Sequence, residues 1–437
     1  MKKISRRNFL LVTGAAGMSA LLAGCGGSKS GSSTAGSTAV GSTASRNSEA
    51  KGGYTIAICE PGASDEATAR DTFCLDYLSE VYNCKFIISE PCKDSDAVAA
   101  FIENCADMGC DGFIDFSTSD CYNDCQMCRD YGMAYMYNGG KGANDGNKKI
   151  FAEQPDNFVG CFGADVPSMA KLYGEYLDEH ASDDGSEGFM ILSSTACTGG
   201  FQQTEITRSL LEAIAAKYDL TYTGYENDLD ALIAIDAPTE IANSKGLNIY
   251  IYPGNHSTNT ESWLSGVSSV LQTGKYAFLA SAGQTFAVTA QTVAEIETEF
   301  NFNITCMSPA TISETLVSAF NTKDQFGNPS IDFVTVKSAT MTAGFAFAMM
   351  YNFLSGHSDM MRPDGKADRL AFSQWAISDA ETLNTIKDWD QAATQNWAAN
   401  STWIDRMLAE KNPDLTLKEM QETIFDFTVD YAIEIHE

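Results

Sequence analysis

The stretch Phe158-Val159-Gly160-Cys161-Phe162-Gly163-Ala164-Asp165 is an apolar run of strand length that ends on an aspartate. The residues that follow, 168–179, form a helical pattern. A short, continuous apolar run followed by a helix is the repeating unit of a parallel sheet that is covered on both faces. This stretch therefore predicts an α/β fold.

The same unit recurs on both sides of this stretch. In the first half of the chain the expected strands are residues 54–60, 85–90, 112–117, 133–138 and 158–165. In the second half they are residues 188–194, 248–255, 276–281, 303–308 and 331–338. Right-handed crossovers between such strands produce two doubly wound parallel-sheet lobes. Ligands of these sheets bind beyond the carboxyl ends of the strands, so we expect a site between two facing lobes.

The N-terminal segment has the pattern of a lipoprotein export signal. Its apolar run, residues 9–22, is shorter than the about 20 residues that a membrane-spanning helix needs. Leu21-Leu22-Ala23-Gly24-Cys25 resembles the bacterial lipobox. We expect a signal peptide over residues 1–24, lipidation of Cys25 with chains such as palmitate, and an extracytoplasmic protein anchored to the cell membrane. Arg6-Arg7 fits both the twin-arginine and the general export route, and the choice stays open.

Residues 26–53 consist almost entirely of Gly, Ser, Thr and Ala, a composition that builds no core. With Cys25 they form a tether, residues 25–53, with a root-mean-square reach of about 30 Å. The whole chain has a net charge of −30 and is 44% hydrophobic, which suits a large acidic globular protein. Such a surface repels nucleic acid, and no basic patch with interleaved aromatic residues is present, so we expect no nucleic-acid partner.

Thirteen cysteines are present, and most of those after Cys25 lie in apolar strand or helix patterns. We interpret them mainly as small buried hydrophobic residues. Cys121, Cys125 and Cys128 have the spacing with which some enzymes hold an iron–sulfur cluster. The same spacing places all three on one face of a helix over residues 120–131, and a buried helix face is the interpretation we favour.

Two segments resemble the type I periplasmic substrate-binding proteins of sugar-type ABC importers, and the resemblance extends from about Tyr54 to Trp375. The first is Val159 to Asp165 with the helix over residues 168–179. The second is Phe333-Val334-Thr335-Val336 through Gly344 to Leu354-Ser355-Gly356. The resemblance implies an N-terminal lobe over residues 54–165 and 339–375, a C-terminal lobe over residues 166–338 and a hinge between them. Residues 376–437 then form a helical extension beyond the family's usual end.

The resemblance also implies a function. A member of this family captures a small polar solute, a sugar or a related molecule, between its lobes and delivers it to an ABC permease. Where sugar binders commonly carry an Asp-Arg pair, this chain has Asn138-Gly139. The other ligand-binding positions that the resemblance implies are Arg208, Gln284, Ser308 and, after the return strand, Lys337 or Ser338.

Three further candidates follow from the residues themselves. Glu60 and Asn255 end predicted strands, where a ligand acceptor or donor is expected, although polar residues also lead turns there for backbone reasons. Phe201 has a ring that can stack on a sugar, although aromatic residues are more often core. Arg208 has an alternative as well, because it also fits a solvated helix residue.

Catalytic patterns are weak. The four histidines are scattered, with no paired zinc ligands, and no phosphate-binding glycine motif is present. We therefore expect no enzymatic activity, no metal and no cofactor. Two alternatives stay open: a receptor that senses a ligand for a membrane kinase or chemoreceptor, and an exported enzyme.

Overall fold

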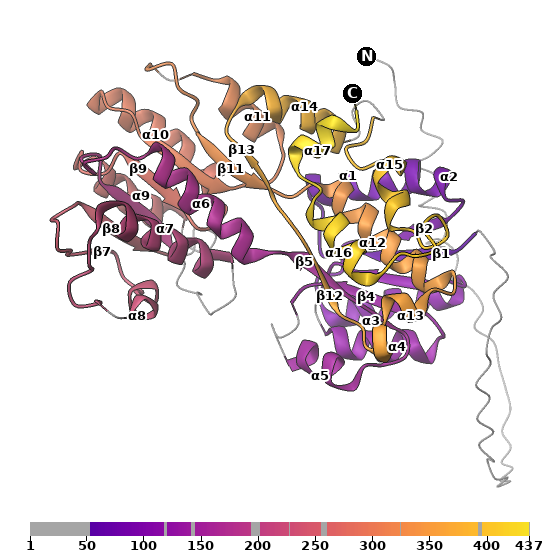
Figure 1. Cartoon of the computed structure of the whole chain (residues 1–437). Helices are drawn as coiled ribbons and strands as arrows, with labels where there is room; N and C mark the ends of the chain where they lie inside the picture. The colour runs from indigo at the N-terminus through magenta and orange to yellow at the C-terminus, as the bar shows by residue number, and fades with distance from the viewer. Residues whose placement is uncertain are drawn as a thin grey trace, which may run out of the picture. The chain divides into compact units, whose positions relative to one another are not determined.

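The computed structural model describes residues 53–117, 120–140, 145–193, 202–226, 228–254, 260–323, 325–391 and 396–436 (Figure 1). The expected signal peptide, Cys25 and nearly all of the tether lie outside these residues. Residues 48–437 belong to one compact unit. None of the described helices has the length and apolarity that a membrane crossing requires.

The first sheet is wholly parallel, with the strand order β12-β5-β4-β3-β1-β2. Its strands are β1 (Thr55–Cys59), β2 (Lys85–Ile88), β3 (Gly112–Asp115), β4 (Ala134–Asn138), β5 (Phe158–Ala164) and β12 (Arg369–Phe372). The helices that connect and cover them are α1 (Asp65–Phe73), continued by a π-helical turn (Cys74–Leu78) and α2 (Ser79–Val81), then α3 (Ser95–Asp107), α4 (Cys121–Asp130), α5 (Asp145–Glu153), α12 (Ala339–Leu354) and α13 (Ser358–Met361).

The second sheet has the order β13-β11-β10-β9-β6-β8-β7 and is parallel except at its two edges, where β13 and β7 are antiparallel. Its strands are β6 (Phe189–Ser193), β7 (Thr239–Glu240), β8 (Ile249–Pro253), β9 (Phe278–Ser281), β10 (Thr305–Pro309), β11 (Phe333–Val336) and β13 (Trp375–Ile377). Its helices are α6 (Val166–His180), α7 (Gln202–Tyr218), α8 (Leu229–Ile233), α9 (Thr260–Leu271), α10 (Phe286–Phe300) and α11 (Glu314–Asn321).

The predicted α/β fold with two parallel-rich sheets is confirmed, and all ten predicted strands are present, with both ends within two residues of the expected ones. The sequence analysis missed β7, β12 and β13. Each has only two to four residues, too few to show a periodicity, and each lies at the edge of a sheet.

The chain passes between the two sheets three times: after β5, after β11, and between β12 and β13. At the first crossing the side chain of Asp165 accepts a hydrogen bond from the Ser168 amide at 3.2 Å and thereby caps α6. The Asp165 amide donates to the Phe372 carbonyl at 2.8 Å, so the first and third crossings lie side by side.

The predicted helical extension is also present, as α14 (Ala380–Asp390), α15 (Ser401–Ile404), α16 (Leu417–Phe425) and α17 (Val429–Glu434). Figure 1 shows α15 and α16, in yellow, beside the orange α12. The Asn352 side chain of α12 donates to the Met407 carbonyl at 2.7 Å and accepts from the Ala409 amide at 2.9 Å. Farther along the chain, α14 contacts α11 through the Lys387–Glu314 ion pair. The extension therefore packs against helices of both sheets.

Eight cysteines gather in one apolar layer between the first sheet and helices α3 to α5. They are Cys59, Cys92, Cys105, Cys110, Cys121, Cys125, Cys128 and Cys161. The three in α4, at positions 121, 125 and 128, have no solvent exposure and share the inner face of that helix. The interpretation of this motif as a buried helix face is confirmed.

Asp124 points into the same region from α4 and is only 2% exposed. The pKa of its carboxyl is raised to about 8. Burial is the main cause, and the negative charges of Asp115 and Asp120 contribute to the same shift. One oxygen of Asp124 has no hydrogen-bond partner among the described residues. The group is therefore neutral over most of the physiological pH range.

This burial predicts a pH-dependent stability. Below pH 4 the Asp124 carboxyl is protonated in both the folded and the unfolded chain, whereas between pH 4 and 8 only the unfolded chain ionises it. Each pH unit in this window then reduces the free energy of unfolding by up to about 1.4 kcal/mol. Asp124→Asn removes the effect, so in denaturant melts its stability relative to the wild type is expected to increase from pH 5 to pH 8.

Asp130→Asn, an exposed substitution in the same helix, is the control and leaves the pH profile unchanged. Parallel pH profiles for the wild type and Asp124→Asn would contradict the assignment.

Candidate functional site

In each sheet the carboxyl ends of the parallel strands meet at one edge, and polar residues stand there. On the first sheet Glu60 follows β1, Asn138 ends β4 and Asp165 follows β5. On the second sheet the corresponding residues are Ser193, Ser281, Ser308 and Lys337. The carboxyl ends of the strands in these two sheets, with the polar residues there, are the candidate site.

Glu60 is 3% exposed and is held by Arg70 of α1. The guanidinium binds both carboxylate oxygens, with Nε–Oε1 at 2.7 Å and Nη2–Oε2 at 2.5 Å. It also lies 3.8 Å from the centre of the Phe116 ring. A bidentate pair of this kind occupies the acceptors of Glu60. In this structure the carboxylate therefore positions Arg70.

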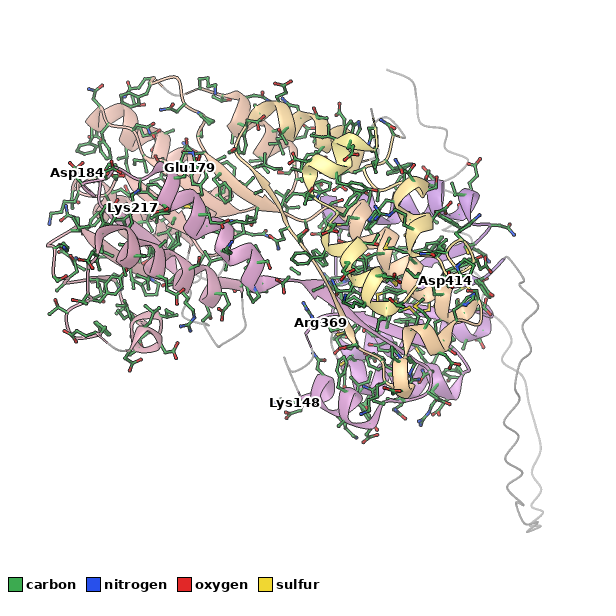
Figure 2. The ribbon with its side chains drawn as sticks, in the orientation of Figure 1. Lys148, Glu179, Asp184, Lys217, Arg369 and Asp414 are labelled. Atoms are coloured by element: carbon green, nitrogen blue, oxygen red, sulfur yellow. The ribbon has the colours of Figure 1, made fainter. Side chains whose placement is uncertain are left out.

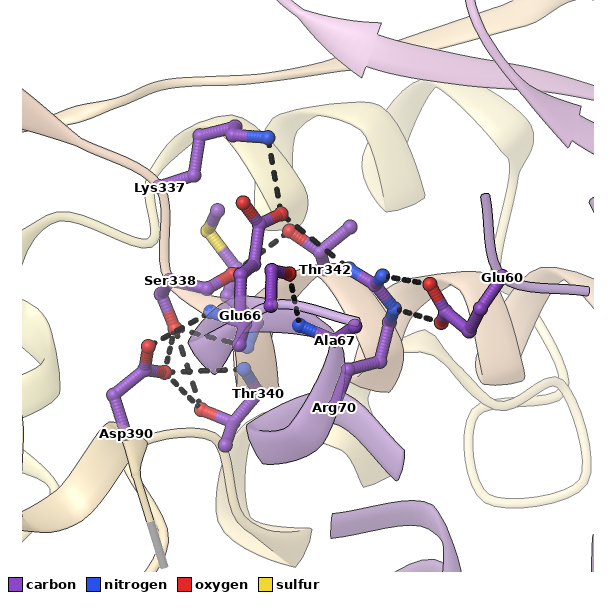
Figure 3. A network of polar contacts seen from close by, with 12 residues as sticks. Glu60, Glu66, Ala67, Arg70, Lys337, Ser338, Thr340, Thr342 and Asp390 are labelled. Atoms are coloured by element: carbon purple, nitrogen blue, oxygen red, sulfur yellow. Dashed lines mark hydrogen bonds and ion pairs between the residues drawn. The ribbon is translucent and has the colours of Figure 1, made fainter. Parts of the chain in front are cut away.

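The pair continues into a longer network (Figure 3). Arg70 Nη1 lies 3.3 Å from Glu66 Oε1, and the same oxygen accepts a hydrogen bond from Lys337 Nζ at 3.0 Å. Lys337 follows β11 of the second sheet, so the network joins the ends of strands from both sheets. Two predicted residues, Glu60 and Lys337, are thus connected through two that the sequence analysis did not select.

Asp390 of the extension closes the other side of this region, as Figure 3 also shows. Its carboxylate accepts from Ser338 Oγ at 2.5 Å, from the amides of Ala339 and Thr340 at 2.8 and 3.0 Å, and from Thr340 Oγ1 at 2.8 Å. Burial raises its pKa, and these hydrogen bonds oppose the shift. The carboxylate therefore holds the start of α12 directly after Lys337.

The second sheet offers hydroxyl groups at its edge. Ser308 Oγ donates to the carbonyl of Gly283 at 3.1 Å, which places the predicted Ser308 close to the predicted Gln284. Gln284 is exposed, and its side-chain oxygen lies 3.4 Å from Thr311 Oγ1. Ser193, at the end of β6, is 4% exposed, and its hydroxyl has no hydrogen-bond partner in the described part of the chain.

Among the described residues, no hydrogen bond or ion pair joins the side chains of Asn138 and Arg208 to this network. Asn138 is half-buried at the end of β4. Arg208 of α7 pairs with Asp230 of α8 at 2.5 Å and with Glu205 at 3.6 Å. Phe201 and Asn255 lie outside the described residues.

Sequence reasoning missed Arg70, Ser193 and Arg369. Sequence reasoning could have selected Ser193, because this serine ends the apolar run of β6. Arg70 has no such signal, since a single arginine in an amphipathic helix usually reaches solvent. Arg369 starts the short strand β12, which the sequence analysis did not recognise.

Comparison with solved structures identifies the architecture. The crystal structure of a periplasmic ribose ABC transporter from Conexibacter woesei matches with a TM-score of 0.52 at 14% identity, covering 79% of this chain and 99% of that chain. The chain has the type I periplasmic binding protein fold. No family model matches the chain, and neither does any curated protein sequence.

Two further solved structures match this chain with lower TM-scores. A solute-binding protein from Actinobacillus succinogenes with bound D-allose has a TM-score of 0.49 at 12% identity, covering 76% of this chain and 99% of that chain. A solute-binding protein from Bacillus halodurans with bound myo-inositol has a TM-score of 0.48 at 11% identity, covering 78% of this chain and 99% of that chain. The match to the Conexibacter woesei structure, at 14% identity, concerns the fold, and the resemblance noted in the sequence is confirmed at that level.

The ion-pair network leads to a stability prediction. Arg70→Ala leaves the buried Glu60 carboxylate without its cation, and such a loss typically costs about 3–5 kcal/mol. Urea unfolding is expected to show this decrease, whereas Arg129→Ala, at an exposed arginine of α4, changes stability by about 0.5 kcal/mol or less. The double variant Arg70→Ala with Glu60→Gln should recover part of the loss, because no charge is then buried. Equal stabilities of Arg70→Ala and Arg129→Ala would contradict the assignment.

Proposed function

We propose that this chain is a non-catalytic, extracytoplasmic solute-binding protein that captures a small polar ligand and delivers it to an ABC permease. The observation that carries the proposal is the fold itself: two parallel-rich sheets joined by three crossings, with polar residues at the carboxyl ends of the strands. A carbohydrate-like ligand is supported by the matched structures, which are described as a ribose transporter and as binders of D-allose and myo-inositol.

The proposed mechanism is closure of two lobes about the three crossings, with lobes over residues 54–165 and 339–375 and over residues 166–338. A ligand that contacts strand ends of both sheets favours the closed state, because only that state makes both sets of contacts. Asn138 and Ser193 suit hydroxyl groups, since an amide and a serine each both donate and accept hydrogen bonds. The other proposed contacts are Phe201, Arg208, Asn255, Gln284, Ser308 and Lys337.

Glu60 has a different part in this proposal. Its carboxylate is occupied by Arg70, so we assign it to positioning the network that reaches Lys337. The ligand then meets the outer end of this network rather than Glu60 itself.

The membrane association is proposed from the N-terminal sequence. Lipidation at Cys25 and the tether over residues 25–53 would keep the binding protein beside its permease at the outer face of the membrane.

A ligand screen tests the proposed function. In a thermal-shift measurement on the full-length protein, one class among sugars, polyols, nucleosides and amino acids is expected to raise the melting temperature in a saturable way. A ligand at 100 times its Kd stabilises by about 2.7 kcal/mol. Asn138→Ala should reduce this shift without changing the unliganded melting temperature, and Asn104→Ala, at an exposed asparagine of α3, should retain it. Absence of any saturable shift in all four classes would count against solute binding.

A fractionation experiment tests the anchor. The wild type is expected in the membrane fraction, labelled by a palmitate analogue, and Cys25→Ser is expected to lose the label because its hydroxyl does not replace the acylated thiol. Ser28→Ala, three residues farther along the tether, is the control and should retain the label. Labelling of Cys25→Ser at the wild-type level would show that the lipid is attached elsewhere.

A further inference from the structure

Arg369, the first residue of β12, places its guanidinium at the carboxyl edge of the first sheet. Its Nε donates to the Gly139 carbonyl at 3.2 Å, and its Nη2 donates to the Ala164 carbonyl at 2.7 Å. Gly139 directly follows β4 and Ala164 ends β5. In Figure 2 Arg369 is labelled close to the ends of these strands. The side chain is half-buried, and these two bonds fix its plane.

A glycine makes room for this guanidinium. A Cβ atom at Gly163 of β5 would lie 2.8 Å from Arg369 Nη2 and 3.2 Å from the Gly139 carbonyl oxygen. Any larger residue there would have to displace the guanidinium. Arginine carries five N–H donors, and the two carbonyl bonds use two of them. The group is therefore held in place by backbone atoms with donors remaining.

Arg369 forms no ion pair with a carboxylate among the described residues. The acids nearby have other partners. Asp115, which ends β3, accepts hydrogen bonds from the hydroxyls of Ser117 and Tyr135 at 2.6 and 2.8 Å. Glu60 and Glu66 are balanced by Arg70 and Lys337, and the Asp165 side chain caps α6. The corresponding strand ends of the second sheet carry the uncharged hydroxyls of Ser193, Ser281 and Ser308. Among the described residues the Arg369 guanidinium therefore has no carboxylate partner of its own, and Asp165, next to the carbonyl that Nη2 bonds, is the acid that follows β5.

We propose that Arg369 binds the carboxylate of an acidic sugar and so selects a uronate over the corresponding neutral sugar. This inference rests on the proposed function and names its ligand class. A carboxylate accepts two parallel N–H bonds from a guanidinium and neutralises its charge, whereas a hydroxyl group leaves the charge uncompensated. The net negative charge of the protein does not cancel this local preference, because exposed charges are screened over about 8 Å at physiological ionic strength.

The test compares matched sugars by calorimetry on the full-length protein: D-galacturonate with D-galactose, and D-glucuronate with D-glucose. At least one uronate is expected to bind 10-fold or more tightly than its neutral counterpart. Arg369→Gln is expected to lose that preference and to weaken binding of the uronate at least 10-fold, with little change in binding of the neutral sugar.

Arg362→Gln is the matched control. The Arg362 guanidinium also bonds to backbone carbonyls, those of Gln154, Asp156 and Gly365. The first two of these carbonyls lie before the start of β5 and the third before the start of β12, at the amino ends of the strands and therefore away from the candidate site. Its removal should leave the uronate preference intact. If Arg369→Gln does not fold, Gly163→Ala allows the same comparison of uronate with neutral sugar. This variant keeps the arginine, but the added methyl group displaces its guanidinium from the observed position. Loss of the preference in that variant supports the inference, and an unchanged preference contradicts it.

The outcomes separate the two proposals. If a neutral sugar binds as tightly as its uronate, or if Arg369→Gln weakens both equally, the carboxylate assignment is overturned while sugar binding stands. If the screen finds a ligand only among nucleosides or amino acids, the sugar assignment is overturned while solute binding stands. If no solute of any class binds to the folded protein, both proposals are overturned.

Discussion

The burial of α12 on all its sides is the constraint on which most of this structure depends. Fourteen of its sixteen residues are buried, so a single sheet could not cover it. The first sheet covers one side and the C-terminal extension covers the other, where Trp403 and Ile404 pack closely against Gly344. The extension is therefore part of the core. It also explains why the chain continues after the strands are complete: without residues 396–436 the outer face of α12 would meet water.

The first turn of α12 connects this core to the candidate site. Asp390 receives four hydrogen bonds there, two of them from backbone amides that would otherwise be unsatisfied at a helix start. Lys337, the residue directly before Ser338 at the start of α12, begins the ion-pair network that ends at Glu60. Any movement about the middle crossing must therefore carry this network with it or separate Lys337 from Glu66. This link connects the strand ends of the candidate site to the middle crossing.

The sequence predicted the strands of both sheets because a buried parallel strand is a continuous apolar run, visible in five to eight neighbouring residues. For the same reason Glu60 was selected as a polar residue that ends such a run, whereas Lys337 was selected through the family resemblance. Their partners were not predictable. Glu66 and Lys337 are 271 residues apart, and only the packing of α1 beside the crossing brings them together. The partner of Arg208 was equally unpredictable, because the carboxylate of Asp230 comes from a separate short helix.

The sequence by itself determined the α/β class, the two sets of strands, the buried face of α4 with its three cysteines, and the helical extension. Each of these depends on periodicity within a short segment, which the residues carry wherever the segment lies. Only the tertiary structure decided which polar groups are occupied and which have donors to spare. Glu60 has its carboxylate bound by Arg70, whereas the guanidinium of Arg369, in a strand too short to recognise, bonds to two backbone carbonyls beside Gly163. Hydrogen bonds and ion pairs depend on distances between segments, and no local pattern encodes those distances.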